Sequence, residues 1–368
     1  MRALSKARNI ARATVCELRL YPAMLRKRQG KSRVMILPCA PRVEGASLLR
    51  AYNIGEYLAS QRWSVILCDH SLRRSQRVRI ARLARPDVIL IQMARHPDNA
   101  PQPFAPIPAV FDIDDADFQT ESQLPRLLAN MEGCRAVIAG SRYIADWCRK
   151  HNPDVTVIWT ATQVRPGPVR SQRDREKILS WAASEPVGYP REAAFVLDLM
   201  TCLKGRRSDL RLRLYGDDGS AEYAALVDRF RDAGIAIETR PTMAYDAFLR
   251  SLEDVAVGLN PFINMVGFSA GKSFGKVLAY LDANVPSINT PNVDHPLFFE
   301  HGRNGFLADA EVEPWADLAE RLIEAPDQRE RIAQAARADL VRRLSLQAAG
   351  SRVEAVLERA IAASPHSA

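Results

Sequence analysis

Two lysines, Lys272 and Lys276, stand four residues apart in the second half of the chain, and the first of them belongs to a run of mostly small residues. The run, SAGKS at 269–273, is typical of a loop that opens a helix, and the spacing puts both lysines on one helical face. The first turn of a helix offers unpaired N–H groups and a positive dipole end, which bind phosphate. We therefore predict a diphosphate site here, where cations and amides stabilise the charge that a departing phosphate gains.

A second group of reactive side chains follows a predicted strand at 109–113, where Asp112, Asp114 and Asp115 lie within four residues. A carboxylate at the end of a strand can accept or orient the proton of a hydroxyl group. We predict a catalytic or acceptor-binding role for these aspartates. Two other interpretations stay open, namely capping of the loop that follows and ligation of a divalent cation.

Apolar runs alternate with amphipathic stretches along most of the chain, which is typical of βαβ units in a parallel sheet. In the first half we predict strands at 33–38, 65–68, 87–92, 109–113, 136–140 and 155–159. The helices between them are predicted at 47–61, 73–84, 124–134 and 142–151. A first domain therefore spans 32–165.

The polar segment 162–177 contains two prolines and interrupts this alternation, so we interpret it as an interdomain linker. Strands then follow at 178–182, 210–216, 236–239, 255–260 and 286–289. Helices are predicted at 191–204, 223–233, 244–252, 273–281, 315–324, 327–344 and 346–362. The result is two Rossmann-like, doubly wound α/β domains, 32–165 and 178–344, that face a cleft at the carboxyl ends of their strands.

Size and composition agree with this division. The chain has 368 residues, of which 47% are apolar and 26% charged, and this suits two soluble domains better than one. None of the six cysteines forms a C-x-x-C pair and the six histidines are scattered, so we expect reduced thiols and no metal cluster.

The formal net charge of +8 belongs to the first 31 residues, which contain nine basic side chains and one acidic side chain, Glu17. The rest of the chain is neutral, which argues against a nucleic-acid partner. Apolar residues recur in this leader at near-helical spacing: Leu4, Ala7, Ala11, Val15, Leu18 and Leu25. Such a helix can lie on an anionic membrane surface, with Pro22 expected to kink or end it. A solvated leader and an organelle transit peptide are the alternatives.

The second half resembles retaining glycosyltransferases of family 4 in four successive blocks: DVAVGLNP at 254–261, GKSFGKVLAYL at 271–281, ANVPSINT at 283–290 and HGRNGFL at 301–307. The tail is similar too, and in relatives the last helix, here within 345–368, crosses back to the first domain. The resemblance implies the GT-B fold, no catalytic metal, and a nucleotide-sugar donor bound by the small and basic residues of one loop: Ser269, Gly271, Lys272, Ser273 and Lys276.

The first half resembles the same superfamily more loosely, through GASLLRAYNIGEYL at 45–58, VFDIDD at 110–115 and AGSRYIA at 139–145. Loops that approach the donor in relatives correspond here to Gly45, Asn292 and His295. Retaining relatives are thought to react by front-face attack that the donor's own phosphate assists. The resemblance therefore requires no nucleophilic side chain.

One departure from the family pattern concerns activity. Relatives often carry two glutamates eight positions apart, the second of which holds the nucleotide ribose, and the corresponding residues here are Gly271 and Ala279. Asp282, three residues further along the predicted helix, is a substitute to consider. Without both carboxylates, either the donor is held differently or the protein has lost activity.

We therefore predict a glycosyltransferase that moves a sugar from a nucleotide-sugar donor to a glycan or lipid-linked acceptor, with retention, in cell-envelope or exopolysaccharide synthesis. It needs no cofactor, and it resides in the cytoplasm or at the inner face of the membrane. An inactive GT-B scaffold that binds a membrane complex through 1–31 is the alternative. A 2-epimerase of the same fold lacks the carboxylates it needs, and a dehydrogenase lacks G-x-G-x-x-G after the first strand.

Overall fold

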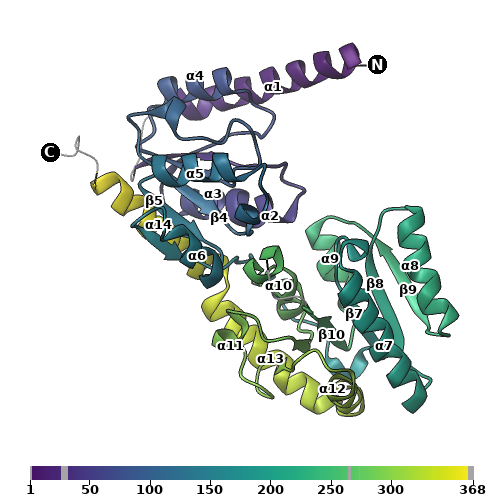
Figure 1. The fold of residues 1–368 in the computed structure, drawn as a ribbon. Helices are drawn as coiled ribbons and strands as arrows, with labels where there is room; N and C mark the ends of the chain where they lie inside the picture. The colour runs from purple at the N-terminus through teal and green to yellow at the C-terminus, as the bar shows by residue number, and fades with distance from the viewer. Residues whose placement is uncertain (1, 26–31, 264–266, 273, 364–368) are drawn as a thin grey trace. The chain divides into compact units, whose positions relative to one another are not determined.

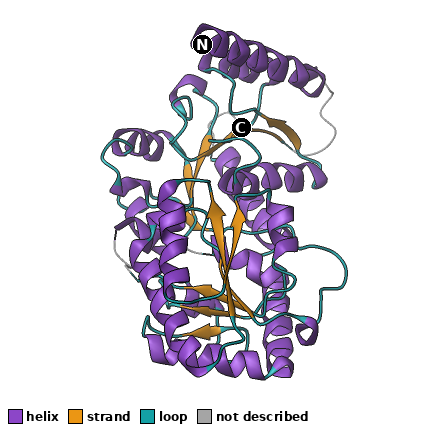
Figure 2. Cartoon of the chain, turned by 90° about the vertical axis from the view of Figure 1, so that its right-hand side faces the viewer, coloured by secondary structure: helices purple, strands orange, loops and turns teal. Residues whose placement is uncertain are grey.

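The computed structural model describes residues 2–25, 32–263, 267–272 and 274–363, and over 2–10 the backbone alone. The chain forms two compact units (Figure 1). Unit 1 comprises residues 1–163 and 345–368, and unit 2 comprises residues 164–344. In each unit, helices flank a β-sheet, whose strands are orange in Figure 2.

Unit 1 is built on six parallel strands in the order β2-β1-β3-β4-β5-β6. The strands are β1 (Arg33–Leu37), β2 (Ser64–Leu67), β3 (Val88–Gln92), β4 (Ala109–Ile113), β5 (Ala136–Ala139) and β6 (Val155–Val157). The α-helices are α1 (Arg2–Leu25), α2 (Gly45–Ser47), α3 (Asn53–Ser60), α4 (Arg74–Ala84), α5 (Leu124–Gly133), α6 (Arg142–Cys148) and α14 (Leu346–Ala362).

Side chains of these strands alternate between the two faces of the sheet. In β1, Met35 and Leu37 join an apolar cluster with α4, α5 and α6, whereas Val34 and Ile36 join a second cluster with α3 and α14. Helices thus cover both faces, which explains why the strands read as continuous apolar runs. The C-terminal helix α14 is part of the core of unit 1.

The helix that we predict over 47–61 is interrupted. α2 passes into a π-helical turn over Leu48–Tyr52, and α3 continues from Asn53. The wider turn carries Arg50, whose side chain is buried. Apolar periodicity does not reveal such a turn, because a π-helical turn closes with i→i+5 hydrogen bonds and adds only one residue to the α-helical pattern.

Unit 2 has a second sheet of six parallel strands in the order β12-β11-β10-β7-β8-β9. The strands are β7 (Ile178–Trp181), β8 (Arg211–Asp217), β9 (Ile237–Pro241), β10 (Val257–Asn260), β11 (Ser287–Asn289) and β12 (Phe306–Leu307). The α-helices are α7 (Pro190–Arg206), α8 (Ala221–Asp232), α9 (Tyr245–Ser251), α10 (Gly275–Asp282), α11 (His295–Phe298), α12 (Val312–Glu324) and α13 (Pro326–Arg343).

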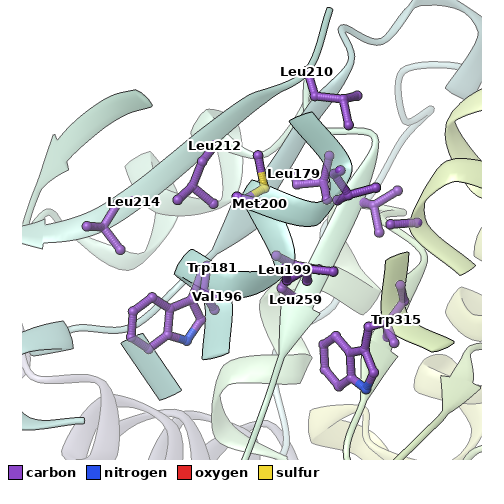
Figure 3. Packing of buried hydrophobic residues seen from close by; sticks show 14 of the residues in the cluster. Leu179, Trp181, Val196, Leu199, Met200, Leu210, Leu212, Leu214, Leu259 and Trp315 are labelled. Atoms are coloured by element: carbon purple, nitrogen blue, oxygen red, sulfur yellow. The ribbon is translucent and has the colours of Figure 1, made fainter. Parts of the chain in front are cut away.

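Two tryptophans anchor the main core of unit 2, where leucines of β7, β8 and β10 meet α7 and α12 (Figure 3). Trp181 and Trp315 are both almost completely buried. The indole N–H of Trp315 donates to the carbonyl of Asp309 at 2.8 Å, and its ring meets Phe195 edge to face at 5.1 Å. The ring of Trp315 therefore buries a large apolar surface while its polar N–H keeps a hydrogen-bond partner.

From residue 164 onward, the polar segment 162–177 belongs to unit 2. The guanidinium of Arg175 donates to the carbonyls of Val255 at 3.0 Å and Ala283 at 2.8 Å. The carbonyl of Gln172 accepts a hydrogen bond from Arg329 at 2.7 Å. These contacts fix the segment beside the first strand of unit 2.

The two parallel sheets and the returning C-terminal helix confirm the predicted GT-B class of fold. β12, with two residues, and α11, with four, escaped prediction because such short elements show no periodicity. Pro22 was predicted to kink or end the leader helix, and it does not end the helix, since α1 continues to Leu25. Pro22 is exposed, and burial of Met24 against unit 1 offsets the single backbone hydrogen bond that the proline lacks.

Candidate functional site

Several loops of unit 2 follow the carboxyl ends of its strands, where doubly wound sheets place their ligand sites. β10 leads into residues 261–274, and β11 leads into residues 290–295. Within the first of these loops lies the 3-10 turn Gly267–Gly271, and α10 begins at Gly275. We call residues 269–276 the lysine loop, and it lies at this edge of the sheet.

Lys276 occupies the first turn of α10, with its ammonium over aromatic rings. Nζ lies 4.1 Å from the ring centre of Tyr189 and 5.8 Å from that of Phe262. The rings attract the cation but do not replace the water that burial removes. Burial, reinforced by the charge of Lys272 and opposed by that of Glu192, therefore lowers the pKa of Lys276 to about 8. An anion beside Nζ would raise it again.

Glu192, a buried acid in the first turn of α7, was not among the predicted site residues. Its Oε1 accepts a hydrogen bond from the backbone N–H of Ile263 at 3.0 Å, so it fixes the segment that follows β10. Its charge also acts on Lys276. Acidic residues are common at helix starts, so the sequence contains no signal for this second role.

Lys272 lies just after the 3-10 turn, and its backbone is held on both sides. Its N–H donates to the carbonyl of Ser269 at 3.1 Å, and its carbonyl accepts a hydrogen bond from Nδ2 of Asn292, also at 3.1 Å. Its Nζ lies 4.6 Å from the ring centre of Phe268. The structure thus brings Lys272 and Lys276 together in the lysine loop, and Asn292 of the loop after β11 is hydrogen-bonded to it.

Asn292 and His295 stabilise the loop after β11, residues 290–295, through hydrogen bonds to its own backbone. Oδ1 of Asn292 accepts from the N–H groups of Asp294 at 3.0 Å and His295 at 2.8 Å. His295 is fully buried, its Nδ1 donates to the carbonyl of Thr290 at 3.0 Å, and its ring meets that of Phe299 edge to face. His295 is therefore enclosed by its own loop and its aromatic neighbours, and its donor contact stays a prediction.

The first turn of α10 supplies backbone N–H groups at the same place. A helix leaves these groups without intrahelical partners. Phe274, which precedes the helix, provides no side-chain cap, and Gly275 is exposed. Gly271 is buried in the 3-10 turn, while Ser273 lies outside the described residues. Two ammonium groups near the N–H groups of a helix start form an arrangement that suits an anion.

Position 279, where relatives place the ribose-binding glutamate, lies in the core. Ala279 is fully buried in an apolar cluster that includes Ile178. Asp282 is fully buried as well, and its Oδ1 accepts from Arg337 at 2.8 Å and from the N–H of Arg165 at 3.1 Å. Because these bonds engage its carboxylate away from solvent, Asp282 is not the substitute that we considered.

Asp112 lies in β4, in the interior of unit 1. The guanidinium of Arg50 donates two hydrogen bonds to the carboxylate of Asp112, one of them from Nε to Oδ2 at 3.1 Å. It also donates to the carbonyl of Ile158 at 2.7 Å. Both charged side chains are buried, so each compensates the desolvation of the other. A structural ion pair therefore replaces the predicted catalytic role of Asp112. An arginine among the apolar positions of 48–58 was the only sequence signal for it.

Asp114 and Asp115 follow β4 and are partly exposed. Oδ2 of Asp115 accepts from Arg95 at 2.6 Å, and the same guanidinium binds Asp117 at 2.6 Å. Gly140, after β5, approaches so closely that a Cβ there would lie 2.7 Å from Cα of Asp114. Both carboxylates thus sit at the carboxyl edge of the unit 1 sheet, whereas the lysine loop belongs to unit 2.

Gly45 begins α2 in the loop after the first strand of unit 1. It is exposed, and a Cβ at this position would meet no atom within 4 Å. Behind it, the hydroxyl of Ser47 accepts from the N–H of Ala40 at 3.1 Å and donates to Oε1 of Gln92 at 2.9 Å. The loop is therefore well fixed, and a donor contact of Gly45 stays a prediction.

No family model and no curated protein matches the chain. Among solved structures, HepE from Anabaena in complex with UDP-glucose matches with a TM-score of 0.67 and 14% identity, over 89% of this chain and 100% of that chain. Sucrose-phosphate synthase from Thermosynechococcus elongatus matches with a TM-score of 0.67 and 12% identity, over 91% and 100%. AviGT4, a glycosyltransferase involved in avilamycin A biosynthesis, gives 0.63 and 17%, over 90% and 98%.

These matches extend over nearly the whole of this chain and of each matched chain. At such identities the likeness establishes the fold. The chain therefore has the two-domain GT-B fold that the sequence analysis predicted.

Proposed function

We propose that this protein is a glycosyltransferase that moves a sugar from a nucleotide-sugar donor to a glycan or lipid-linked acceptor, with retention. The observation that carries the proposal is the pair of ammonium groups, Lys272 and Lys276, at the start of α10. HepE, which has the same fold, is described in complex with UDP-glucose. A uridine diphosphate sugar is therefore the first donor to test.

The lysine loop acts on the leaving group. When the glycosidic bond to the diphosphate breaks, negative charge grows on the β-phosphate. Cations and N–H groups that are already oriented stabilise this charge without reorganisation. The pKa of Lys276 is about 8, so an approaching phosphate secures its proton and its positive charge. The attacking hydroxyl enters from the face that the diphosphate leaves, and its proton passes to the phosphate.

We assign the acceptor to the carboxyl edge of the unit 1 sheet. Asp114 and Asp115 are partly exposed there and offer oxygens that orient a hydroxyl group. Arg95, bound to Asp115 and Asp117, fixes the loop that presents them. Asp112 contributes indirectly, because its pairing with Arg50 holds the end of β4.

The nucleotide is held without the ribose contact of the relatives, because Ala279 provides no carboxylate. A hydrogen bond to a charged group contributes about 1.5–3 kcal/mol. We therefore expect modest nucleotide affinity that depends mainly on the diphosphate. A 2′-deoxynucleotide diphosphate should bind nearly as well as the ribonucleotide, and a clear preference for ribose would show that another residue holds it.

The proposed setting is assembly of a cell-envelope glycan or exopolysaccharide in the cytoplasm, at the inner face of a membrane. The charge of the leader supports this location, since residues 1–31 carry nine basic side chains and one acidic side chain. A glycan carried on a lipid is the acceptor class that such a location favours.

An inactive GT-B scaffold is the second candidate, and the apolar burial of Ala279 favours it. A thermal-shift screen against UDP, GDP and their sugars, repeated with Lys272→Ala and Lys276→Ala, separates the two. A transferase is stabilised by at least one nucleotide, and the substitutions weaken that effect. If no nucleotide shifts the melting temperature, the transferase proposal fails. If a shift survives both substitutions, only the assignment of the lysine loop fails.

A further inference from the structure

The leader helix α1 has one side packed on unit 1 and the opposite side open (Figures 1 and 2). Ala13, Glu17 and Met24 lie on the packed side and are buried. On the other side, three large apolar side chains are exposed: Val15 by 47%, Leu18 by 60% and Leu25 by 82%. Their spacing places them on one face of the helix. The helix therefore presents an apolar stripe to its surroundings.

The acidic residue of the leader is turned away from this stripe. Glu17 accepts hydrogen bonds from Arg79 at 2.6 Å and from Gln76 at 2.8 Å, both in α4. The bond from Arg79 lowers the pKa of Glu17, so the carboxylate stays ionised and is neutralised within the protein. Arg19 is exposed beside the stripe, and so is Arg12, whose guanidinium also lies 4.0 Å from a carboxylate oxygen of Asp69.

α4 continues the same kind of surface. Arg82 lies three residues, and Leu83 four, beyond Arg79, the residue that contacts α1. Arg82 is exposed, and Leu83 is 52% exposed. The sequence of α4 contains four arginines and no acidic residue. The two helices therefore repeat one pattern, an exposed apolar side chain beside exposed arginines.

We propose that the exposed faces of α1 and α4 together form one binding surface for anionic lipid head groups, with Val15, Leu18, Leu25 and Leu83 at the level of the acyl chains. We call it the α1–α4 surface. The proposal rests on the membrane location given under the proposed function, and it adds α4, which lies outside the leader. Arginines attract phosphate head groups, and the apolar side chains between them enter the interface.

The observations favour a membrane over a nucleic acid. Phosphate recognition on a nucleic acid uses cations but gains nothing from an exposed leucine stripe, whereas an interfacial helix needs both. Among the described residues no helix is long and apolar enough to cross a bilayer. We therefore expect contact with the surface of the membrane. The hydrogen bonds from Gln76 and Arg79 of α4 to Glu17 keep α1 packed on unit 1 when the protein binds.

Co-sedimentation of the full chain with vesicles tests the surface. Vesicles of phosphatidylcholine, with and without phosphatidylglycerol, are compared at low and high salt. Binding should require phosphatidylglycerol and fall with salt. Arg82→Glu should weaken binding at least about fivefold, since each cation near an anionic surface contributes about that factor. Leu18→Asp and Leu83→Asp should each weaken it about tenfold.

Two substitutions elsewhere serve as matched controls. Arg229→Glu in α8 reverses an exposed arginine, and Val341→Asp in α13 changes a side chain that is 51% exposed. Both should leave vesicle binding unchanged. Melting curves show that each variant is folded, and nucleotide shifts measured in parallel report on the transferase proposal independently.

Several outcomes would overturn the α1–α4 surface. If Leu18→Asp weakens binding while Arg82→Glu and Leu83→Asp do not, α4 has no part in it. Equal binding to neutral vesicles would refute the role of anionic lipids. A stronger affinity for single-stranded RNA than for the vesicles would assign the surface to nucleic acid. Vesicle binding with the expected pattern, but without any nucleotide shift, would uphold the surface while the transferase proposal fails.

Discussion

Replacing Lys276 by methionine tests the proposed anion site through two opposite effects. In the folded protein the pKa of this lysine falls from an ordinary 10.5 to about 8. At pH 7 both the folded and the unfolded chain carry the proton, so the folded state bears the full cost of the buried charge. That cost is roughly 3 kcal/mol at most, because the side chain keeps some contact with water.

Methionine removes the charge and keeps an unbranched chain over Tyr189 and Phe262. We therefore expect Lys276→Met to raise the melting temperature by several degrees. The variant should bind nucleoside diphosphates about 10- to 100-fold more weakly, because it loses a charge-assisted contact with phosphate. Differential scanning calorimetry and isothermal titration measure the two quantities. A variant that is destabilised, or that binds with unchanged affinity, would refute our account of this lysine.

The pH dependence gives a second test on the same pair of proteins. For a lysine whose folded pKa is lowered, the cost is complete below about pH 8 and disappears as the pH rises toward 10.5. The free energy of unfolding of the wild type should therefore rise relative to Lys276→Met over this interval. Nucleotide affinity of the wild type should fall above pH 8, because binding then requires uptake of a proton. Parallel pH profiles of the two proteins would contradict both expectations.

Three further substitutions test other parts of the structure. Asp112→Ala leaves the buried charge of Arg50 without its carboxylate and should lower the free energy of unfolding by about 3–5 kcal/mol in urea titrations, with nucleotide affinity unchanged. Gly258→Ala would place a Cβ 2.8 Å from the ring of Tyr280 and should cost about 1–3 kcal/mol, whereas a neutral result would show that the ring can move. Asn292→Ala removes the donor to the lysine loop and the acceptor for two N–H groups, so nucleotide affinity should fall about tenfold in titrations and the protein should lose stability. Asn292→Asp keeps the acceptor and should recover part of the stability.

Most of the fold could be predicted because long buried strands and amphipathic helices leave periodic patterns. The run at 33–38 and the helix at 346–362 illustrate this, since each must bury a continuous apolar face. The lysine loop was predicted from the spacing of Lys272 and Lys276 on one helical face, but α10 begins only at Gly275, so Lys276 lies in the helix and Lys272 precedes it.

The remaining features depend on partners far away in the sequence. Arg50 meets Asp112 across 62 residues, and Glu192 meets Ile263 across 71. The sequence shows three aspartates within the six residues 110–115, but it does not show which of their side chains is buried. The burial of His295 could not be predicted for the same reason, since it depends on how the loops after β10 and β11 pack together.

The release of nucleoside diphosphate from candidate donors tests the central claim most directly. The wild-type protein is incubated with UDP- and GDP-sugars, with and without glycan acceptors, beside the double substitution Lys272→Ala/Lys276→Ala. We expect the wild type to release diphosphate from at least one donor, faster with its acceptor, and the double variant to release it at the background rate. Release that is equal in both proteins would contradict the role of the lysine loop, and a wild type that releases none from any donor would contradict the transferase itself.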